Sequence, residues 1–293
     1  MLLLDHILVA TDFSTISNAA LRHALGIASR CHSTVSLVHV IDALLYGMAP
    51  DGIAAAVDCA EWNSELVIKQ LQHEGVLNGQ TPEVTITVGT VWQTISNIIR
   101  EQRPGLVVLG THGRSGLPKL VLGSVAECAF RESPCPVLTV GPHVRGSKTS
   151  GAQARHLLVP TDLSMQSTNA LRYGISLASA TGGDMTLLHV LKPHAGRAGE
   201  EAPPTIEAKK QLTEFLNQHP GASTMVTPRI EFGDPASTIV EVAEQMRSDL
   251  IVMGLRAWST DGCAMWRTAY KVVIHACCPV LTMKSPALTA SEP

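Results

Sequence analysis

The sequence predicts an α/β protein made of two similar halves in tandem. The chain has 293 residues, which suffices for two cores of ordinary domain size. Of these residues 45% are hydrophobic but only 4% are aromatic, so the cores must consist mainly of Ala, Val, Leu and Ile. That composition is typical of parallel strands covered by helices on both faces. Short apolar runs also alternate with helical patterns along the chain, as in α/β folds.

An internal repeat sets the expected domain organisation. Residues 9–41 return at 159–191, and the offset falls from 150 there to 144 where Gly110 matches Gly254. About six residues are therefore missing from the middle of the second copy. Residues 141–154 are rich in Gly, Ser and Lys and have no apolar periodicity, as expected of a linker. We expect a first domain over residues 1–142, a linker over 143–154, a second domain over 155–285 and a loose tail over 286–293.

Each element of the first copy has its own signal. Residues 6–10 form a short apolar run, and Ser14 can cap a helix that extends to about Arg30 with apolar residues at helical spacing. The later elements follow in the same alternation: strand 35–40, helix 53–77, strand 84–88, helix 90–103, strand 106–109, helix 124–131 and strand 137–140. Five strands with four intervening helices predict an open, doubly wound parallel sheet that binds ligands at the carboxyl ends of its strands.

Charge and cysteine patterns exclude several classes of protein. The net charge is −3 without any block of like charges, which disfavours capture of nucleic acid. The apolar start of the chain ends at Asp5, and no later apolar run approaches about 18 residues, so we expect a cytoplasmic protein without a membrane span. The seven cysteines match neither a zinc site nor a disulfide framework. We interpret them as mostly buried thiols; a redox role for adjacent Cys277 and Cys278 is the alternative.

A glycine-rich segment follows the fourth strand. It runs from Gly110 through Gly113 to Gly116, and Gly123-Ser124 then stand at the start of the next helix. Glycine lets the backbone turn with positive φ and approach an anion closely, and N–H groups at a helix start attract negative charge. Three cationic side chains of the loop could neutralise phosphate: His112, Arg114 and Lys119. The segment therefore predicts a phosphate site.

The glycine spacing closely resembles the ATP-binding signature of the universal stress protein family. The resemblance extends to residues 9–14, 37–40 and 134–138 and covers nearly the whole chain twice, as in a tandem two-domain member. It implies two adenine-nucleotide α-hydrolase-like (Rossmann-like) domains, each with an open five-stranded parallel sheet. It also implies ATP, accompanied by Mg²⁺, in the first domain, with adenine near Asp12 and the Val40 backbone. The implied site consists of Ala10, Thr11, Asp12, Val40, Leu109, Gly110, His112, Gly113, Arg114, Gly116, Gly123, Ser124 and Val125.

The second copy departs from this signature. Gly254 remains, but Arg267-Thr268 replace Gly123-Ser124. A bulky Arg267 at the helix start, with Trp258 and Trp266 nearby, would crowd the place where backbone must meet phosphate. We predict that this copy does not bind ATP in the family's manner.

Features kept in both copies have a simpler interpretation. Asp12 has a counterpart in Asp162, so it either contacts the nucleotide or binds backbone N–H groups where a helix begins. His39 has a counterpart in His189 and is interpreted as a core histidine. The glycines could merely permit a tight connection, although one or two would suffice for that. Residues 141–148 look like a phosphate loop but have Ser-Lys where Gly-Lys-Ser/Thr is needed, and we reject them.

Three functions remain open from the sequence. The first is a regulatory nucleotide-binding protein, with an adenine nucleotide and an unknown regulatory protein as partners. The second is a slow ATP-hydrolysing enzyme, for which Asp12 and His112 are the only candidate groups near the loop. The third is an interaction module in which strands 137–140 and 280–283 pair and form an intramolecular pseudo-dimer, as the resemblance to this family implies. Further homodimerisation of the whole chain is also expected.

Overall fold

One mixed sheet runs through the part of the chain that the computed structural model describes, which comprises residues 4–46, 51–77, 79–113, 122–145, 154–192, 203–219, 225–255 and 263–284. The N-terminal half contains β1 (His6–Ala10), α1 (Thr15–Cys31), β2 (Thr34–Asp42), α2 (Ala43–Tyr46), α3 (Gly52–His73), β3 (Glu83–Gly89), α4 (Val91–Gln102), β4 (Leu106–Gly110), α5 (Ser124–Glu132) and β5 (Val137–Val140). The C-terminal half contains β6 (His156–Thr161), α6 (Met165–Thr181), β7 (Asp184–Leu191), α7 (Pro203–Asn217), β8 (Val226–Phe232), α8 (Pro235–Gln245), β9 (Leu250–Leu255), α9 (Cys263–His275) and β10 (Val280–Lys284).

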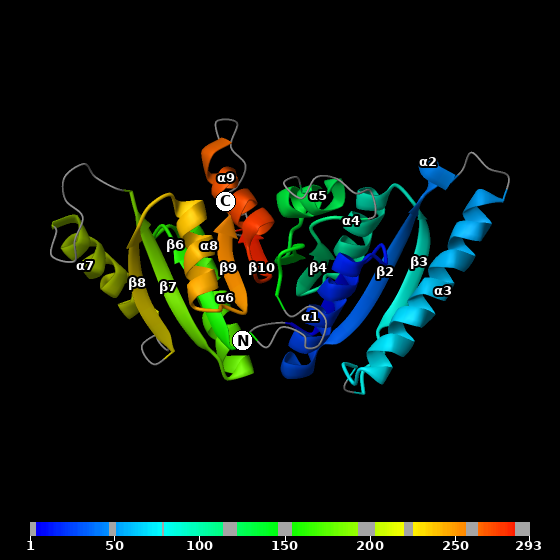
Figure 1. Ribbon diagram of the computed structural model, residues 1–293, viewed down its shortest axis with the longest axis horizontal. Coiled ribbons are helices and arrows are strands. Elements are labelled where there is room, and N and C mark those ends of the chain that lie inside the picture. Colours follow the sequence, from blue (N-terminus) through cyan, green and yellow to red (C-terminus); the bar gives the residue numbers. More distant parts are fainter. Residues whose placement is uncertain are drawn as a thin grey trace, which may run out of the picture.

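The strand order confirms the predicted fold class and joins the two halves. The order is β3-β2-β1-β4-β5-β10-β9-β6-β7-β8, and β3 and β8 lie at opposite ends of the molecule (Figure 1). Strands within each half are parallel, whereas β5 and β10 pair antiparallel, with Leu138 opposite Leu281 and Val137 opposite Thr282. The predicted pairing of the final strands is therefore confirmed. Two five-stranded parallel sheets become one ten-stranded sheet.

Helices cover both faces of this sheet, because side chains along each strand alternate between the faces. Ile7 and Val9 of β1 belong to the core under α1, α3, α6 and α7, whereas Leu8 and Ala10 belong to the core under α4, α5, α8 and α9. Both cores are dominated by small and branched apolar residues, as the composition indicated. None of the described helices is both long and apolar enough to span a membrane.

The helix ends follow local chemistry. Ser14 caps α1 by accepting a hydrogen bond from the Ser17 N–H, and Ser164 does the same for α6. The predicted helix over 53–77 ends earlier, at His73. Gly75 follows with φ of 70°, a left-handed conformation that interrupts the helix. The four-residue helix α2 was not predicted, and its residues are half-buried or exposed.

The cysteines are less buried than expected. Among those whose side chains the structure describes, only Cys278 is buried, and Cys59 on α3 is exposed. The expectation of mostly buried thiols is therefore wrong. The reason is that α1, α3 and α5 each cover only one face of the sheet, so their outward cysteines remain partly in contact with solvent. Cys277 and Cys278 lie where the halves meet, since the Arg145 N–H donates to the Cys277 carbonyl at 2.9 Å.

Candidate functional site

A cavity of about 290 Å³ opens at the carboxyl ends of β1, β2 and β4. The strand order reverses there, because β1 has β2 on one side and β4 on the other. All the predicted site residues that the structure describes line the cavity. Arg114 and Gly116, with Lys119, lie outside the described residues. The wall also includes residues that were not predicted: Ser17, Val38, His39, Leu45, Val91, Ile95, Thr111 and Ala126.

Some of the unpredicted wall residues could have been identified from the sequence, and others could not. Val91 and Ile95 share one face of α4 at helical spacing, so that pattern could have identified them. Leu45 belongs to α2, for which the sequence gave no signal. His39 was interpreted as a core residue, but it is half-buried in the cavity wall, with its Nδ1 2.7 Å from the Thr11 carbonyl oxygen.

The turn after β1 fixes Asp12 at the mouth of the cavity. Asp12 Oδ1 accepts a hydrogen bond from the Ser14 N–H at 3.0 Å, and the intervening Phe13 has φ of 59°. The C-terminal half repeats this turn, since Asp162 Oδ1 accepts from the Ser164 N–H at 3.1 Å. The helix-start role of Asp12, one of the two interpretations of this residue, is thus present in both halves.

A stretch of β2 backbone extends past its neighbour at one end of the cavity. The register of β1 with β2 ends where Ala10 stands opposite Val38, and the Thr11 N–H donates to the Val38 carbonyl at 2.9 Å. Strand β2 continues to Asp42 beside β3. Backbone groups alternate in direction along a strand, so Val40 points its N–H and C=O to the same side as Val38, beyond the end of β1. A donor and an acceptor on one edge suit the edge of a purine base.

The start of α5 lies at the other end of the cavity. Gly123 occupies the N-cap position without a side-chain cap, and Ser124 and Val125 line the cavity. The Gly123 N–H donates to the Thr111 carbonyl at 2.8 Å, which fixes the helix start against the end of β4. The first N–H groups of an α-helix have no partner inside the helix, so this end can bind an anion.

His112 provides a second polar group in the same cavity. Its ring is nine-tenths buried, and its Nδ1 lies 2.9 Å from the Thr111 hydroxyl. Within the described part of the chain, its Nε2 is buried without a hydrogen-bond partner. If the Thr111 hydroxyl donates to Nδ1, the neutral ring carries its proton on Nε2, which is then a buried donor in the wall of the cavity. A buried donor without a partner is costly unless a ligand satisfies it.

The three glycines of the signature serve different purposes. None of these three has a positive φ, so the left-handed conformation that glycine permits is not used at these positions; Gly116 lies outside the described residues. A Cβ on Gly110 would come within 2.9 Å of Ile16 Cγ2, and one on Gly254 would collide with the Gln166 backbone. Close packing therefore explains why glycine stands at this position in both halves, at Gly110 and at Gly254. A Cβ on Gly113 would instead meet the Asp12 carboxylate, and one on Gly123 the Thr111 carbonyl at 3.1 Å.

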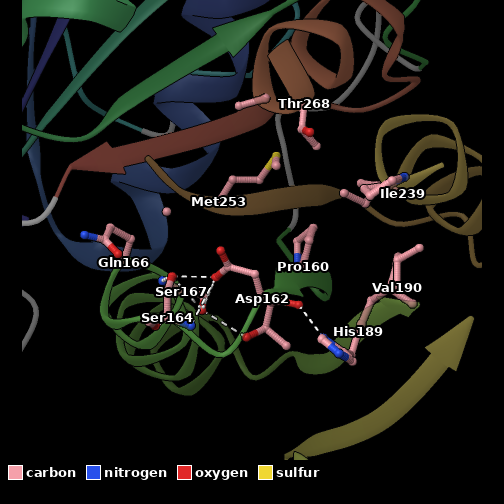
Figure 2. A pocket seen from close by; sticks show the side chains of 15 residues that line it. Pro160, Asp162, Ser164, Gln166, Ser167, His189, Val190, Ile239, Met253 and Thr268 are labelled. Carbon is pink, nitrogen blue, oxygen red and sulfur yellow. Dashed lines mark hydrogen bonds between the residues drawn. The ribbon is translucent and has the colours of Figure 1, made fainter. Parts of the chain in front are cut away.

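The C-terminal half has an equivalent cavity of about 240 Å³, drawn in Figure 2. Its helix α9 begins at Cys263, so Arg267 and Thr268 lie inside the helix. The prediction of Arg267 at the helix start is wrong, and its side chain is exposed. Trp258 and the side chain of Trp266 lie outside the described residues. Because the Thr268 N–H is within the helix, no helix start exists at the position equivalent to Ser124.

Comparisons with known proteins agree with this architecture. A model of the universal stress protein family matches residues 4–141 and 153–284. A universal stress protein of Mycolicibacterium smegmatis is 27% identical over 294 residues, covering 95% of this chain and 96% of its own length. One from Methanocaldococcus jannaschii is 30% identical over 154 residues, covering 46% of this chain and 93% of its own length.

A solved structure extends the comparison to the whole fold. The crystal structure of a universal stress protein from Archaeoglobus fulgidus superposes with a TM-score of 0.69 at 21% identity, covering 96% of this chain and 99% of that one. Since the family model matches both halves, the chain belongs to the universal stress protein family as a tandem protein with two such units.

Proposed function

We propose that the N-terminal cavity binds ATP and that the protein is a nucleotide-dependent regulator of a stress response. The observation that carries this proposal is that one end of the cavity suits a purine base and the other end suits phosphate. The backbone edge at Val40 offers a donor and an acceptor for adenine, while the uncapped start of α5 offers N–H groups for phosphate. The C-terminal half acts as a structural partner through the β5–β10 pairing.

The electrostatics of the cavity favour a phosphorylated ligand at its α5 end. The helix dipole places partial positive charge at Ser124 and Val125. If the Thr111 hydroxyl donates to Nδ1 of His112, the unpartnered Nε2 would supply a further donor, and its burial would strengthen a hydrogen bond to an anion. The cavity volume is close to the lower end of the roughly 300–1,000 Å³ typical of small-molecule sites.

Magnesium would reach this site with the nucleotide. The described residues contain no cluster of three or more His, Cys, Asp or Glu side chains able to hold a metal ion. Mg²⁺ in nucleotide sites takes most of its ligands from phosphates and water, with one or two carboxylates from the protein. Asp12, the carboxylate that lines the cavity, is assigned to adenine, so Mg²⁺ would be held through the ATP phosphates and water rather than by a protein carboxylate. The ion would neutralise phosphate charge.

A pair of equivalent substitutions tests the binding site. Ser124→Glu places a carboxylate in the first turn of α5, which favours the helix but repels phosphate. Thr268→Glu makes the same change at the equivalent position of α9. In titration calorimetry with Mg-ATP, we expect one site per chain, at least about tenfold weaker binding for Ser124→Glu and no change for Thr268→Glu. Equal binding by Ser124→Glu and the unaltered protein would contradict the placement of the phosphates.

The regulatory part of the proposal has a separate test. A ligand can control a partner only if it binds the two states of the protein with different affinity. We expect ATP to slow amide hydrogen exchange in residues 111–113 and 122–126, which form the phosphate end of the cavity. Unchanged exchange in these residues, at ATP concentrations that saturate the site, would contradict switching while leaving ATP binding intact.

A further inference from the structure

We propose that Cys277 and Cys278 form a reversible redox site, in which a hydroperoxide oxidises the two adjacent thiols to a disulfide. The pair lies in the turn that joins α9 to β10, near the middle of the molecule in Figure 1. Strand β10 pairs there with β5 of the other half. Both thiols are free in the structure. The proposal does not depend on what either cavity binds.

The two thiols differ in their access to solvent. Cys277 is half-buried, whereas Cys278 is 4% exposed and belongs to the core under α4, α5, α8 and α9. The Cys278 thiol nevertheless faces its neighbour, because it donates a hydrogen bond to the Cys277 sulfur. A small oxidant can therefore reach Cys277 from solvent, while Cys278 stands beside it as a resolving thiol.

The surroundings of Cys277 favour its thiolate, which is the form that attacks oxidants. The hydrogen bond from Cys278 and the positive charge of Arg145 lower the pKa of Cys277. Its partial burial and the Glu244 carboxylate oppose this shift without reversing it. The Arg145 backbone is fixed beside the pair, since its N–H donates to the Cys277 carbonyl at 2.9 Å. The hydrogen bond that Cys278 donates and its burial raise the pKa of Cys278, so this thiol keeps its proton until Cys277 has reacted.

The corresponding turn of the N-terminal half has a single cysteine. When the prolines that precede β5 and β10 are aligned, Cys135 matches Cys278. Pro134 then stands where the second half has Cys277. Burial raises the pKa of Cys135, whose sulfur lies 3.4 Å from the Ser133 hydroxyl. The turn therefore does not need a thiol at the first of these two positions, and the N-terminal half provides a matched control.

The oxidation proceeds in two balanced steps. The Cys277 thiolate attacks the terminal oxygen of a hydroperoxide, so that an S–O bond forms, the O–O bond breaks and the leaving alkoxide or hydroxide takes up a proton. Cys278 then attacks the sulfur of the resulting sulfenic acid. An S–S bond forms, the S–O bond breaks, and the hydroxide leaves with the Cys278 proton as water. Two electrons have then passed from the two thiols to the peroxide.

The short distance between neighbouring residues makes this disulfide easy to reduce. Consecutive Cα atoms are about 3.8 Å apart, whereas the Cα atoms of ordinary disulfides are separated by roughly 4.4–6.8 Å. A disulfide between Cys277 and Cys278 is therefore strained, and strain makes such a bond more reducible. The site suits a switch that cellular thiols reset rather than a permanent crosslink.

The test treats the reduced full-length chain with one equivalent of hydrogen peroxide at neutral pH for a series of times. Remaining thiols are then blocked with N-ethylmaleimide in denaturant, and tryptic peptides are weighed by mass spectrometry. We expect peptide 272–284 to lose two hydrogen atoms and carry no maleimide, and dithiothreitol to restore both thiols. Peptide 132–145, which contains Cys135, should react at least about tenfold more slowly. Equal rates for the two peptides, or a peptide 272–284 that keeps both thiols, would overturn the proposal.

Two variants separate the roles of the thiols, with circular dichroism to show that each is folded. Cys278→Ser keeps a hydrogen-bond donor beside Cys277 but removes the resolving thiol, so peroxide should leave a sulfenic acid that dimedone traps. Cys277→Ser removes the attacking thiol, and Cys278 should then stay reduced at the same peroxide dose. Rapid oxidation of Cys278 in Cys277→Ser, or the absence of a dimedone adduct in Cys278→Ser, would contradict the assigned roles.

Discussion

Acid is expected to destabilise this protein through His23, a residue of α1. The His23 side chain is 4% exposed, and neither ring nitrogen has a hydrogen-bond partner within the described residues. Burial lowers the pKa of His23 from 6.5 to about 4, and the opposing attraction of Asp249 in the C-terminal half is smaller. The folded protein thus holds this ring neutral at a pH where the unfolded chain protonates it.

The sign and size of the effect follow from this difference. Between pH 6.5 and about 4 the unfolded chain binds more protons, so the free energy of unfolding falls as the pH falls through this range. Each pH unit corresponds to about 1.4 kcal/mol, which gives a full loss of about 3 kcal/mol below pH 4. Between about pH 7.5 and about pH 5 the expected loss is about 2 kcal/mol.

The assay is urea unfolding at several pH values, followed by circular dichroism, for the unaltered protein and His23→Leu. Leucine keeps an apolar side chain at the site and cannot titrate, so we expect the variant to lack about 2 kcal/mol of the loss between about pH 7.5 and about pH 5. The hydrogen bond that His156 donates to the Asp184 carboxylate raises the pKa of His156, which acts in the opposite direction but is common to both proteins. Parallel pH profiles for the two proteins would refute the burial argument.

Four further substitutions test the packing by the same unfolding assay. Gly254→Ala places a Cβ against the Gln166 backbone and should cost about 2 kcal/mol or more, whereas Gly174→Ala meets the side chains of Met185 and Val159 rather than backbone and should cost less; equal effects would contradict the explanation of Gly254 by close backbone packing. Ser14→Ala removes the α1 cap and should cost about 1 kcal/mol; an unchanged midpoint would count against the cap. Leu281→Ala, at a fully buried position of β10, should cost about 2–5 kcal/mol, and a loss below that range would mean that the strand contact contributes little.

Much of the fold could be predicted because the signals were local and appeared twice. The apolar strands, the Ser14 cap and the repeat each identified their elements, and the edge pairing of β5 with β10 was predicted from the resemblance to the universal stress protein family. The end of α3 was predicted too late because the helical pattern of the sequence continues past Gly75. The left-handed backbone of Gly75 interrupts the helix there. The backbone conformation of one residue therefore ended a helix that the spacing of apolar residues would have continued.

The candidate site was predicted less completely, for two physical reasons. His39 was misplaced because a histidine on a strand gives no sign of whether its ring faces a core or a cavity. The start of α9 was misplaced because alignment with Ser124 assumed that both helices begin at equivalent residues, whereas α9 starts at Cys263. The conclusion that the second half lacks the phosphate end stays a prediction. Its explanation shifts from a crowding side chain to an earlier helix.

The most direct test of the central claim is the nucleotide content of protein purified without added ligand. Denaturing the protein and separating the supernatant by ion exchange distinguishes ATP and ADP from neutral adenosine. We predict about one charged adenine nucleotide per chain in the unaltered protein and in Thr268→Glu, and a strongly reduced amount in Ser124→Glu. Two nucleotides per chain, or none even after incubation with Mg-ATP, would contradict a single N-terminal site.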